Sequence, residues 1–154
     1  MISVEPLTAA GFAPFGRVIE PDPAVAREIN GGFTTRFHGL ARAESDADVI
    51  LSIFRGRVRP LEVAMVERHP LGTQAFMPLN GRDWLVVVAT KPEVAALRGF
   101  FCRGDQGVQY GTGVWHHPLL VLGEPQDFLV VDRDGVGVNL EEVEFGENVG
   151  IKLE

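Results

Sequence analysis

The sequence of 154 residues contains a single cysteine, Cys102, and no apolar run long enough to cross a membrane. One cysteine cannot form a disulfide within the chain, which excludes the disulfide framework of small secreted proteins. A membrane-spanning helix needs about 20 apolar residues, whereas the longest apolar candidate, Trp84 to Ala89, has the length of a strand. Basic residues are also outnumbered, 14 against 21 acidic ones, for a net charge of −7. This balance disfavours nucleic acids and membrane surfaces as partners.

What the sequence does contain is typical of one folded domain, which we expect to span residues 1–154. The hydrophobic fraction of 45% and the charged fraction of 23% are close to the averages of globular proteins. Eighteen glycines and ten prolines predict many turns and few long helices. The first residues, MISVEPLTAAGF, lack the basic start and apolar core of a signal peptide, so we expect a cytoplasmic protein.

Short runs rich in β-branched and aromatic residues, separated by turn residues, predict a mainly β fold. The expected strands are Phe33 to His38, Val49 to Phe54, Leu61 to His69, Thr73 to Met77, Trp84 to Ala89, Leu119 to Leu122, Asp127 to Asp132 and Val143 to Phe145. Two helices are expected, Ala9 to Phe12 with Thr8 as its cap, and Pro92 to Phe100 with proline at the first position. Such elements favour a sandwich or a small barrel, and a barrel of about eight strands is just wide enough for one small ligand.

Polar residues end the expected strand from Leu61 to His69. In this run Leu61, Val63 and Met65 alternate with other residues and share one face. The same alternation places Glu67 and His69 on that inward face. Burying two ionisable groups without partners costs several kcal/mol, so there they would need a partner, a metal ion or water. Spacing alone equally allows both groups to lie beyond the strand end, in solvent.

The glycine-rich segment from Gly107 to Pro118 contains Trp115, His116 and His117. Neighbouring residues of an extended segment point to opposite sides, and Pro118 favours an extended conformation for His117. We therefore expect at most one of the two histidines to enter a pocket. The alternative is one surface histidine and one hydrogen-bonded core histidine.

A second polar set occurs in the expected strand from Phe33 to His38 and the turn before it. Asn30, Thr34, Arg36 and His38 form this set. Arg36 and His38 share one strand face, and an arginine can bind a carboxylate bidentately. The remaining arginines are expected to be mostly solvated, among them Arg133. Cys102 is expected to be a packed thiol because nothing marks it as activated.

Several segments resemble the ureidoglycolate lyase family, in order along nearly the whole chain. The most specific are Glu67-Arg-His-Pro-Leu-Gly-Thr-Gln-Ala-Phe76 and Val114-Trp-His-His-Pro-Leu119. The resemblance implies a cupin-like β-barrel of the jelly-roll type with a few short helices, and a homodimer. It also implies cleavage of (S)-ureidoglycolate to glyoxylate and urea in allantoin degradation, by a carbon–nitrogen lyase of the amidine-lyase class.

The same resemblance implies a set of metal ligands. Metal-binding cupins carry His-x-His, then an acidic residue, then Pro-x-Gly-x-x-His. At these places the sequence has Glu67-x-His69, then Gln74, then Gly111-Thr-Gly113-Val-Trp-His116. Two of the four usual ligands are therefore histidines and two are replaced. Glu67, His69 and His116 suit a first-row divalent ion, and the resemblance implies Ni²⁺ without an organic cofactor.

For the expected reaction we assign a role to each candidate residue. His116 or His69 would be the base, because an unperturbed imidazole pKa near 6.5 suits proton transfer at neutral pH. Glu67 would orient a histidine or bind metal. Arg36, and next Arg55, would bind the substrate carboxylate, with further substrate contacts from Gln74, Asn30 and Trp115. Two other functions stay open: another cupin enzyme, such as a metal-dependent isomerase or dioxygenase, and a non-catalytic cupin that binds a small acid.

Overall fold

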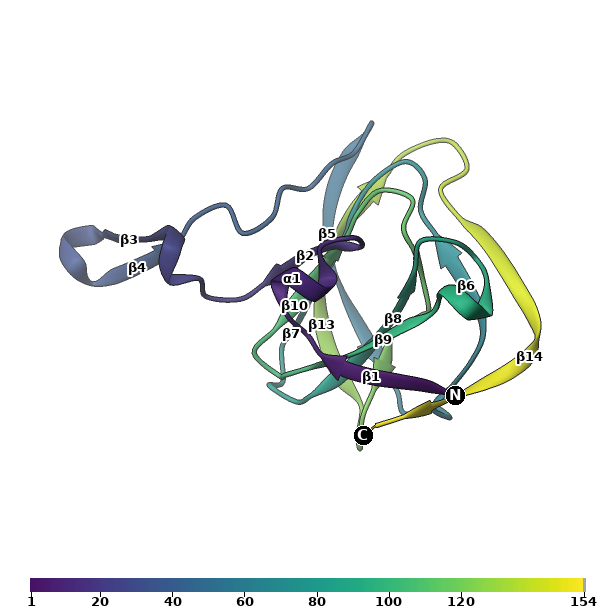
Figure 1. The fold of residues 1–154 in the computed structure, drawn as a ribbon. Helices are drawn as coiled ribbons and strands as arrows, with labels where there is room; N and C mark the ends of the chain where they lie inside the picture. The colour runs from purple at the N-terminus through teal and green to yellow at the C-terminus, as the bar shows by residue number, and fades with distance from the viewer. Residues whose placement is uncertain (154) are drawn as a thin grey trace.

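The computed structural model describes residues 1–153 and shows a mainly β protein (Figure 1). The strands are β1 (Ile2–Pro6), β2 (Gly16–Ile19), β3 (Ala26–Ile29), β4 (Thr34–Phe37), β5 (Asp48–Gly56), β6 (Glu62–Arg68), β7 (Gln74–Pro78), β8 (Trp84–Ala89), β9 (Arg98–Cys102), β10 (Gly107–Tyr110), β11 (Trp115–His116), β12 (Leu120–Val121), β13 (Gln126–Asp134) and β14 (Glu141–Lys152). The helical segments are α1 (Ala9–Phe12) and three 3₁₀ turns, η1 (Pro23–Val25), η2 (Asn30–Gly32) and η3 (Val94–Ala96).

Six strands close into a barrel. Each pairs with the next in the order β6, β14, β1, β9, β8 and β11, and β11 pairs with β6 to complete the ring. The first strand, β1, lies between β14 and β9 and runs parallel to both, so the two ends of the chain build the same wall. The mainly β fold with a barrel and short helices, expected from the sequence, is confirmed.

A second sheet packs on the barrel, with strand order β2, β10, β7, β13 and β5. The core between the two layers combines Trp84 and Val86 of β8 with Phe128 of β13, and the Trp84 and Phe128 rings lie 4.8 Å apart. On the opposite face of β8, Leu85 and Val87 fill the barrel. Because β8 is covered on both faces, its whole sequence is apolar.

The expected helix from Ala9 to Phe12 is confirmed, and the Thr8 hydroxyl accepts the Gly11 N–H at 3.1 Å. The expected helix from Pro92 to Phe100 is wrong. Only the 3₁₀ turn η3 forms there, and the chain continues as β9, which pairs with β8 and β1 on its two sides. Pairing with two neighbours outweighs a weak local helix pattern. Cys102 ends this strand fully buried, as expected, and burial raises the pKa of its thiol.

The eight expected strands are present, but several differ in extent. Val143 to Phe145 is only part of the twelve-residue β14. Six further strands were not expected, because they contain glycine or proline or are very short: β1, β2, β3, β9, β10 and β11.

The expected alternation in β6 is also wrong in part. Val63 and Val66, of opposite parity, are both fully buried, while Met65 is half-buried and lines a surface hollow. The pairing of β6 with β14 shifts register between Glu144 and Val149, which interrupts strict alternation.

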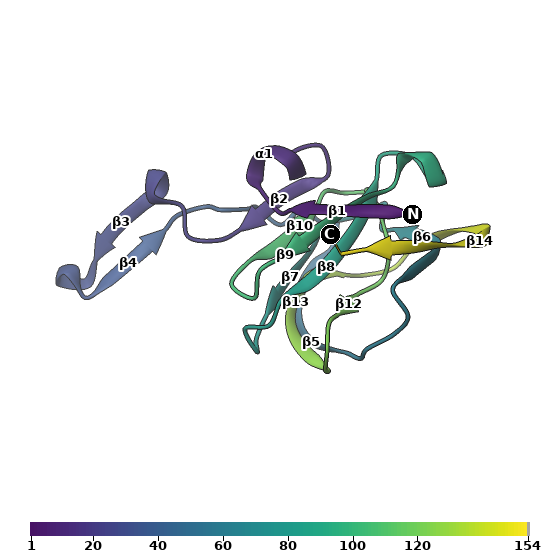
Figure 2. The same cartoon turned by 60° about the horizontal axis from the view of Figure 1, so that its bottom comes forward.

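One hairpin stands apart from both layers. Residues 23–38, which include β3 and β4 and are called the arm below, extend away from the barrel in two views (Figures 1 and 2).

Within residues 1–153, no helix combines the length and the apolar character that crossing a membrane requires.

Candidate active site

A pocket of about 370 Å³ opens between the two layers. Residues from both contribute to its lining: Phe54, Arg55, Gly56, Arg57, Arg59, Glu67, Gln74, Phe76, Tyr110, His116, His117, Pro118 and Leu119. Its apolar side is formed by Phe54 and Phe76, whose rings meet edge to face at 5.8 Å. Its polar side holds the carboxylate and histidines that the sequence singled out.

Glu67, His69 and His116 come together at this pocket. Glu67 of β6 lies directly opposite His116 of β11 in the barrel wall, and His69 follows the end of β6. The Glu67 Oε2 atom lies 3.4 Å from His69 Nε2 and 3.7 Å from His116 Nε2. One ligand atom from each residue lies within 4.8 Å of the others. The three residues therefore form a cluster that can hold a metal ion.

The hydrogen bonds of the two histidines fix the atoms that face Glu67. His69 Nδ1 donates to the Asn139 carbonyl at 2.9 Å, and His116 Nδ1 donates to the Val114 carbonyl at 3.0 Å. A carbonyl only accepts, so in each neutral ring the Nε2 atom carries the lone pair. His69 Nε2 is buried without a hydrogen-bond partner. Three acceptors thus converge on one point, which a proton, a cation or a water molecule between them would satisfy. Histidine held by a backbone carbonyl is also the common arrangement in metal sites.

The protonation preferences of the three groups differ. The neighbouring His69 imidazole, whose Nε2 lies 3.4 Å from Glu67 Oε2, holds the pKa of Glu67 below its usual value, against the effect of burial. Burial alone would lower the pKa of His69, but the Glu67 carboxylate and the Asn139 carbonyl together raise it. Burial, together with neighbouring His69, lowers the pKa of His116 to about 4. At neutral pH His116 is therefore a neutral imidazole with an available lone pair, and its contact with Glu67 is not an ion pair.

Tyr110 and His117 complete the histidine side of the pocket. The Tyr110 ring stacks on His116 with centroids 4.2 Å apart, and burial raises the pKa of the Tyr110 hydroxyl. His117 is buried, and its Nδ1 donates to the Pro118 carbonyl at 2.8 Å. The expectation that at most one of the two histidines enters a pocket is wrong. Because β11 ends at His116, strand alternation does not extend to His117.

Gln74 and three arginines supply further polar groups. The Gln74 amide donates to Asp132 at 3.1 Å, which orients the side chain in the pocket. Arg55 lines the pocket but forms a two-point contact with Asp127, at 2.8 and 3.1 Å. Arg57 and Arg59, which were not expected, also line it and have no carboxylate partner within residues 1–153. Three arginines spaced by two residues, the first inside β5 and the other two just after it, are the signal that would have found them.

Three expected substrate-binding residues lie away from the pocket of their own chain. Asn30 and Arg36 belong to the exposed arm. Trp115 points to the opposite side of β11 from His116, into the barrel core with Val66. The Arg68 guanidinium covers its ring at 4.6 Å.

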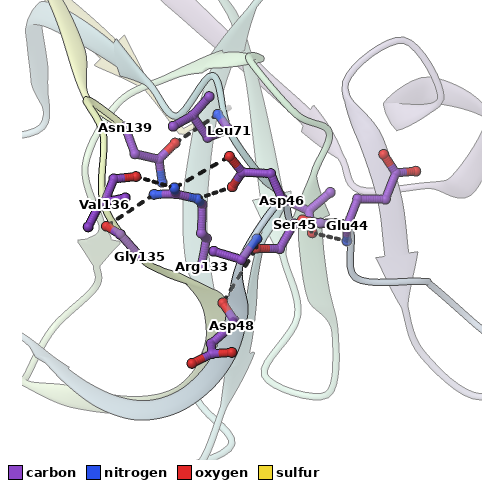
Figure 3. A network of polar contacts seen from close by, with 11 residues as sticks. Glu44, Ser45, Asp46, Asp48, Leu71, Arg133, Gly135, Val136 and Asn139 are labelled. Atoms are coloured by element: carbon purple, nitrogen blue, oxygen red, sulfur yellow. Dashed lines mark hydrogen bonds and ion pairs between the residues drawn. The ribbon is translucent and has the colours of Figure 1, made fainter.

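A polar network holds the loop that orients His69 (Figure 3). Arg133 was expected to be solvated, but its side chain is only 3% exposed. It donates to the Asp46 carboxylate and to the carbonyls of Gly135 and Val136. In the same loop the Asn139 side-chain oxygen accepts the Leu71 N–H at 2.8 Å. The network thus fixes the Asn139 carbonyl that binds His69.

Replacing Asn139 with alanine should loosen this loop. The Leu71 N–H would lose its acceptor, at a cost of about 1–3 kcal/mol in the free energy of unfolding. With the carbonyl less well placed, the pKa of His69 should fall, since that hydrogen bond raises it. Chemical denaturation and NMR titration of the His69 ring would measure both effects. Asn139→Asp keeps an acceptor oxygen for the Leu71 N–H and should unfold close to the wild type; an equal loss of stability in both variants would contradict this role.

Comparisons with known proteins give the same family as the two motifs that contain Glu67 and His116. A family profile described as "Ureidoglycolate lyase" matches residues 1–152. "Ureidoglycolate lyase" of Rhizobium etli is 55% identical over 156 residues, covering 94% of this chain and 91% of the relative. "Ureidoglycolate lyase 1" of Rhizobium meliloti is 55% identical, covering 96% of this chain and 91% of the relative. A protein of the same name from Brucella ovis is 52% identical, with coverages of 95% and 90%.

Proposed function

The chain belongs to the ureidoglycolate lyase family, and on that premise we propose how it cleaves ureidoglycolate. The substrate would be the (S) enantiomer and the products glyoxylate and urea, which makes the enzyme a carbon–nitrogen lyase of the amidine-lyase class in allantoin degradation. The observation that carries the assignment to this pocket is the neutral His116 beside Glu67 and His69.

The reaction is an elimination from a carbinolamide. One carbon of ureidoglycolate carries a hydroxyl group, a carboxylate and the ureido nitrogen. A base removes the hydroxyl proton, the oxygen forms the carbonyl of glyoxylate, and the C–N bond breaks with its electron pair moving to the nitrogen. That nitrogen takes up a proton and leaves as urea. Atoms and electrons balance without water, an oxidant or a covalent enzyme intermediate.

His116 is the best-placed base. Its Nδ1 is occupied by the Val114 carbonyl, so its Nε2 lone pair faces the pocket. Its lowered pKa keeps that lone pair free at neutral pH, and stacking on Tyr110 fixes the plane of the ring. His69 is the alternative base, but its Nε2 faces Glu67 and it does not line the pocket. A positioned general base contributes about 10²–10⁴-fold to a rate.

A divalent ion fits the Glu67, His69 and His116 cluster. With such an ion bound, the His116 Nε2 lone pair would be a metal ligand, so its role as general base applies to the site without the ion. Two imidazole Nε2 atoms and one carboxylate are ligands that first-row metals accept, and both imidazoles are held by backbone carbonyls. We propose Ni²⁺ as the ion on the strength of the family. A bound ion supplies Lewis-acid polarisation of the substrate's oxygen atoms.

Arg59 and Arg57 are proposed to bind the carboxylate of the substrate. Both line the pocket without a carboxylate partner in residues 1–153, whereas Arg55 is engaged by Asp127. Burial lowers the pKa of the His117 imidazole, and the charge of nearby Arg59 lowers it further. Gln74, oriented by Asp132, is proposed to donate its second amide N–H to the ureido carbonyl.

Replacing Arg59 with glutamine should weaken substrate binding more than it slows chemistry. A charge-assisted hydrogen bond is worth about 1.5–3 kcal/mol, so KM should rise roughly 10–100-fold with a smaller change in kcat. Steady-state kinetics with ureidoglycolate would show this. Arg103→Gln makes the same change at an arginine whose partner is Asp105, outside the pocket, and should leave KM unaltered. A fall in kcat with constant KM would contradict the assignment.

The activity itself is tested by product analysis. The protein is incubated with racemic ureidoglycolate before and after treatment with a chelator, and glyoxylate, urea and ammonia are quantified. We expect equal amounts of glyoxylate and urea from one enantiomer, and a slower rate after chelation that added Ni²⁺ restores. Ammonia without urea would identify a hydrolase instead, and absence of glyoxylate would favour a binding protein.

A further inference from the structure

Within residues 1–153, the arm pairs with no strand of the barrel or of the second sheet. Its strands β3 and β4 pair only with each other, and every residue of β3 is exposed. At the tip, Phe33 is 94% exposed. A hollow of about 580 Å³ separates the base of the arm from the barrel. An isolated two-stranded hairpin is marginally stable in water, so a hairpin built this way requires something to pack against.

The edge strand β5 has one edge without a pairing strand. It is nine residues long and pairs with β13 on one side only; within residues 1–153 no strand covers its other edge. Leu51 and Ile53, on the face away from the pocket, are 70% and 58% exposed. Ile50 and Phe54 are more than one-third exposed on the face that includes the pocket. A long, apolar, unpaired edge is rare in proteins that stay monomeric.

The arm also presents charge that its own chain does not neutralise. In the hairpin register Arg27 lies directly opposite Arg36, and like charges in this position are destabilising. With Glu28, the arm carries a net charge of +1, so the rest of the chain, from a total of −7, carries −8. A second copy of the chain therefore offers the arm an apolar edge and, over the molecule as a whole, a net charge of opposite sign.

The chain connects the arm to the edge strand. Residues 39–47 run from the arm to the start of β5 at Asp48, and Asp46 of this segment is bound by Arg133 (Figure 1). The arm therefore reaches well beyond the edge strand of its own chain. Under two-fold symmetry each surface patch meets its complement on the other copy, so two facing β5 regions allow each arm to cross to the other molecule.

We propose that the arm of one copy packs along β5 of a second copy and places its Arg36 at the mouth of that copy's pocket, where it joins Arg57 and Arg59 in binding the substrate carboxylate. Phe54, Arg55 and Gly56 of β5 line this pocket, so an element lying along the strand borders its opening. The pocket is then completed only in the dimer. This inference rests on the proposed function for one point, the identity of the bound anion as the substrate carboxylate. The dimer contact between the arm and β5 does not depend on the proposed function.

Analytical ultracentrifugation tests the contact without reference to catalysis. The wild-type protein should sediment as a dimer, and Phe33→Asp and Leu51→Asp should each shift it to the monomer while circular dichroism shows an unchanged fold. Leu153→Asp replaces an exposed apolar residue outside the arm and β5 and should leave the dimer intact. A wild-type monomer, or a dimer that survives both substitutions, would overturn the proposal.

A mixed dimer tests the shared pocket. Arg36→Ala and His116→Ala chains, carrying different tags, are co-expressed, and the heterodimer is isolated on both tags. Each homodimer should be impaired, Arg36→Ala with a KM raised at least about tenfold. In the heterodimer one pocket has an intact His116 and receives the intact arm of the other chain, so about half of the wild-type rate per dimer should return. Wild-type KM in Arg36→Ala, or no recovery in the heterodimer, would show that Arg36 does not act across the interface. Failure of the wild type to release urea would instead count against the proposed function.

Discussion

Replacing His116 with alanine should lower the rate of urea release by about 10²–10⁴-fold, because the metal-free site loses its general base and the metal-bound site loses one of its three ligands. The residue is buried, its Nδ1 is engaged by Val114, and its Nε2 faces Glu67 and the pocket. His69 and His117 are also held through Nδ1 by backbone carbonyls, but His69 does not line the pocket, and His117 lies beyond the end of β11.

Two controls separate the loss of a base from the loss of packing. His116→Gln preserves much of the side-chain volume next to Tyr110 but has no basic nitrogen, so it should be as inactive as the alanine variant. Added imidazole should restore part of the activity of His116→Ala, since the removed ring leaves a space of that shape. Thermal unfolding confirms that each variant is folded. Wild-type turnover in folded His116→Ala would exclude the role.

Replacing Glu67 with glutamine should lower the activity by about 100-fold or more and weaken the binding of Ni²⁺ at least tenfold. The carboxylate is the only negative charge in the cluster, and both histidine Nε2 atoms face it. An amide has nearly the same shape, but it carries no charge and its N–H₂ group donates to the lone pairs that otherwise bind the ion.

Metal titration by calorimetry gives a readout independent of turnover. Glu62→Gln makes the same substitution on the same strand at an exposed position and should match the wild type in both assays. If Glu67→Gln binds Ni²⁺ as tightly as the wild type, the carboxylate is not a metal ligand. Its contribution would then be limited to holding the proton of His69.

Local sequence patterns predicted much of the strand content, because β-branched runs such as Trp84 to Ala89 are bounded by clear turn residues. They failed where pairing with distant segments decides the conformation. The residues after Pro92 show a helical pattern, yet Phe100 belongs to a strand held between β8 and β1. The alternation in β6 failed for the same reason, since its register depends on β14.

The residues of the candidate site also differ in whether local motifs or distant contacts reveal them. Glu67, His69, Gln74 and His116 were found because two specific motifs carry them, and the pairing of β6 with β11 brings the two motifs together. His117, Arg57 and Arg59 were missed because their approach to the pocket depends on where β11 and β5 end. Asn30, Arg36 and Trp115 have side chains suited to binding the substrate, but they lie outside the pocket of their own chain.

By itself the sequence determined the mainly β class and the ureidoglycolate lyase family, since both depend on residue patterns and on motifs that persist along the chain. The tertiary structure decided which side chains meet. It showed that Glu67 stands beside two histidines whose free nitrogen atoms are set by backbone carbonyls, and that the arm lies away from its own pocket. These facts depend on contacts between residues far apart in the chain, and such contacts exist only after the strands have paired and the side chains have packed.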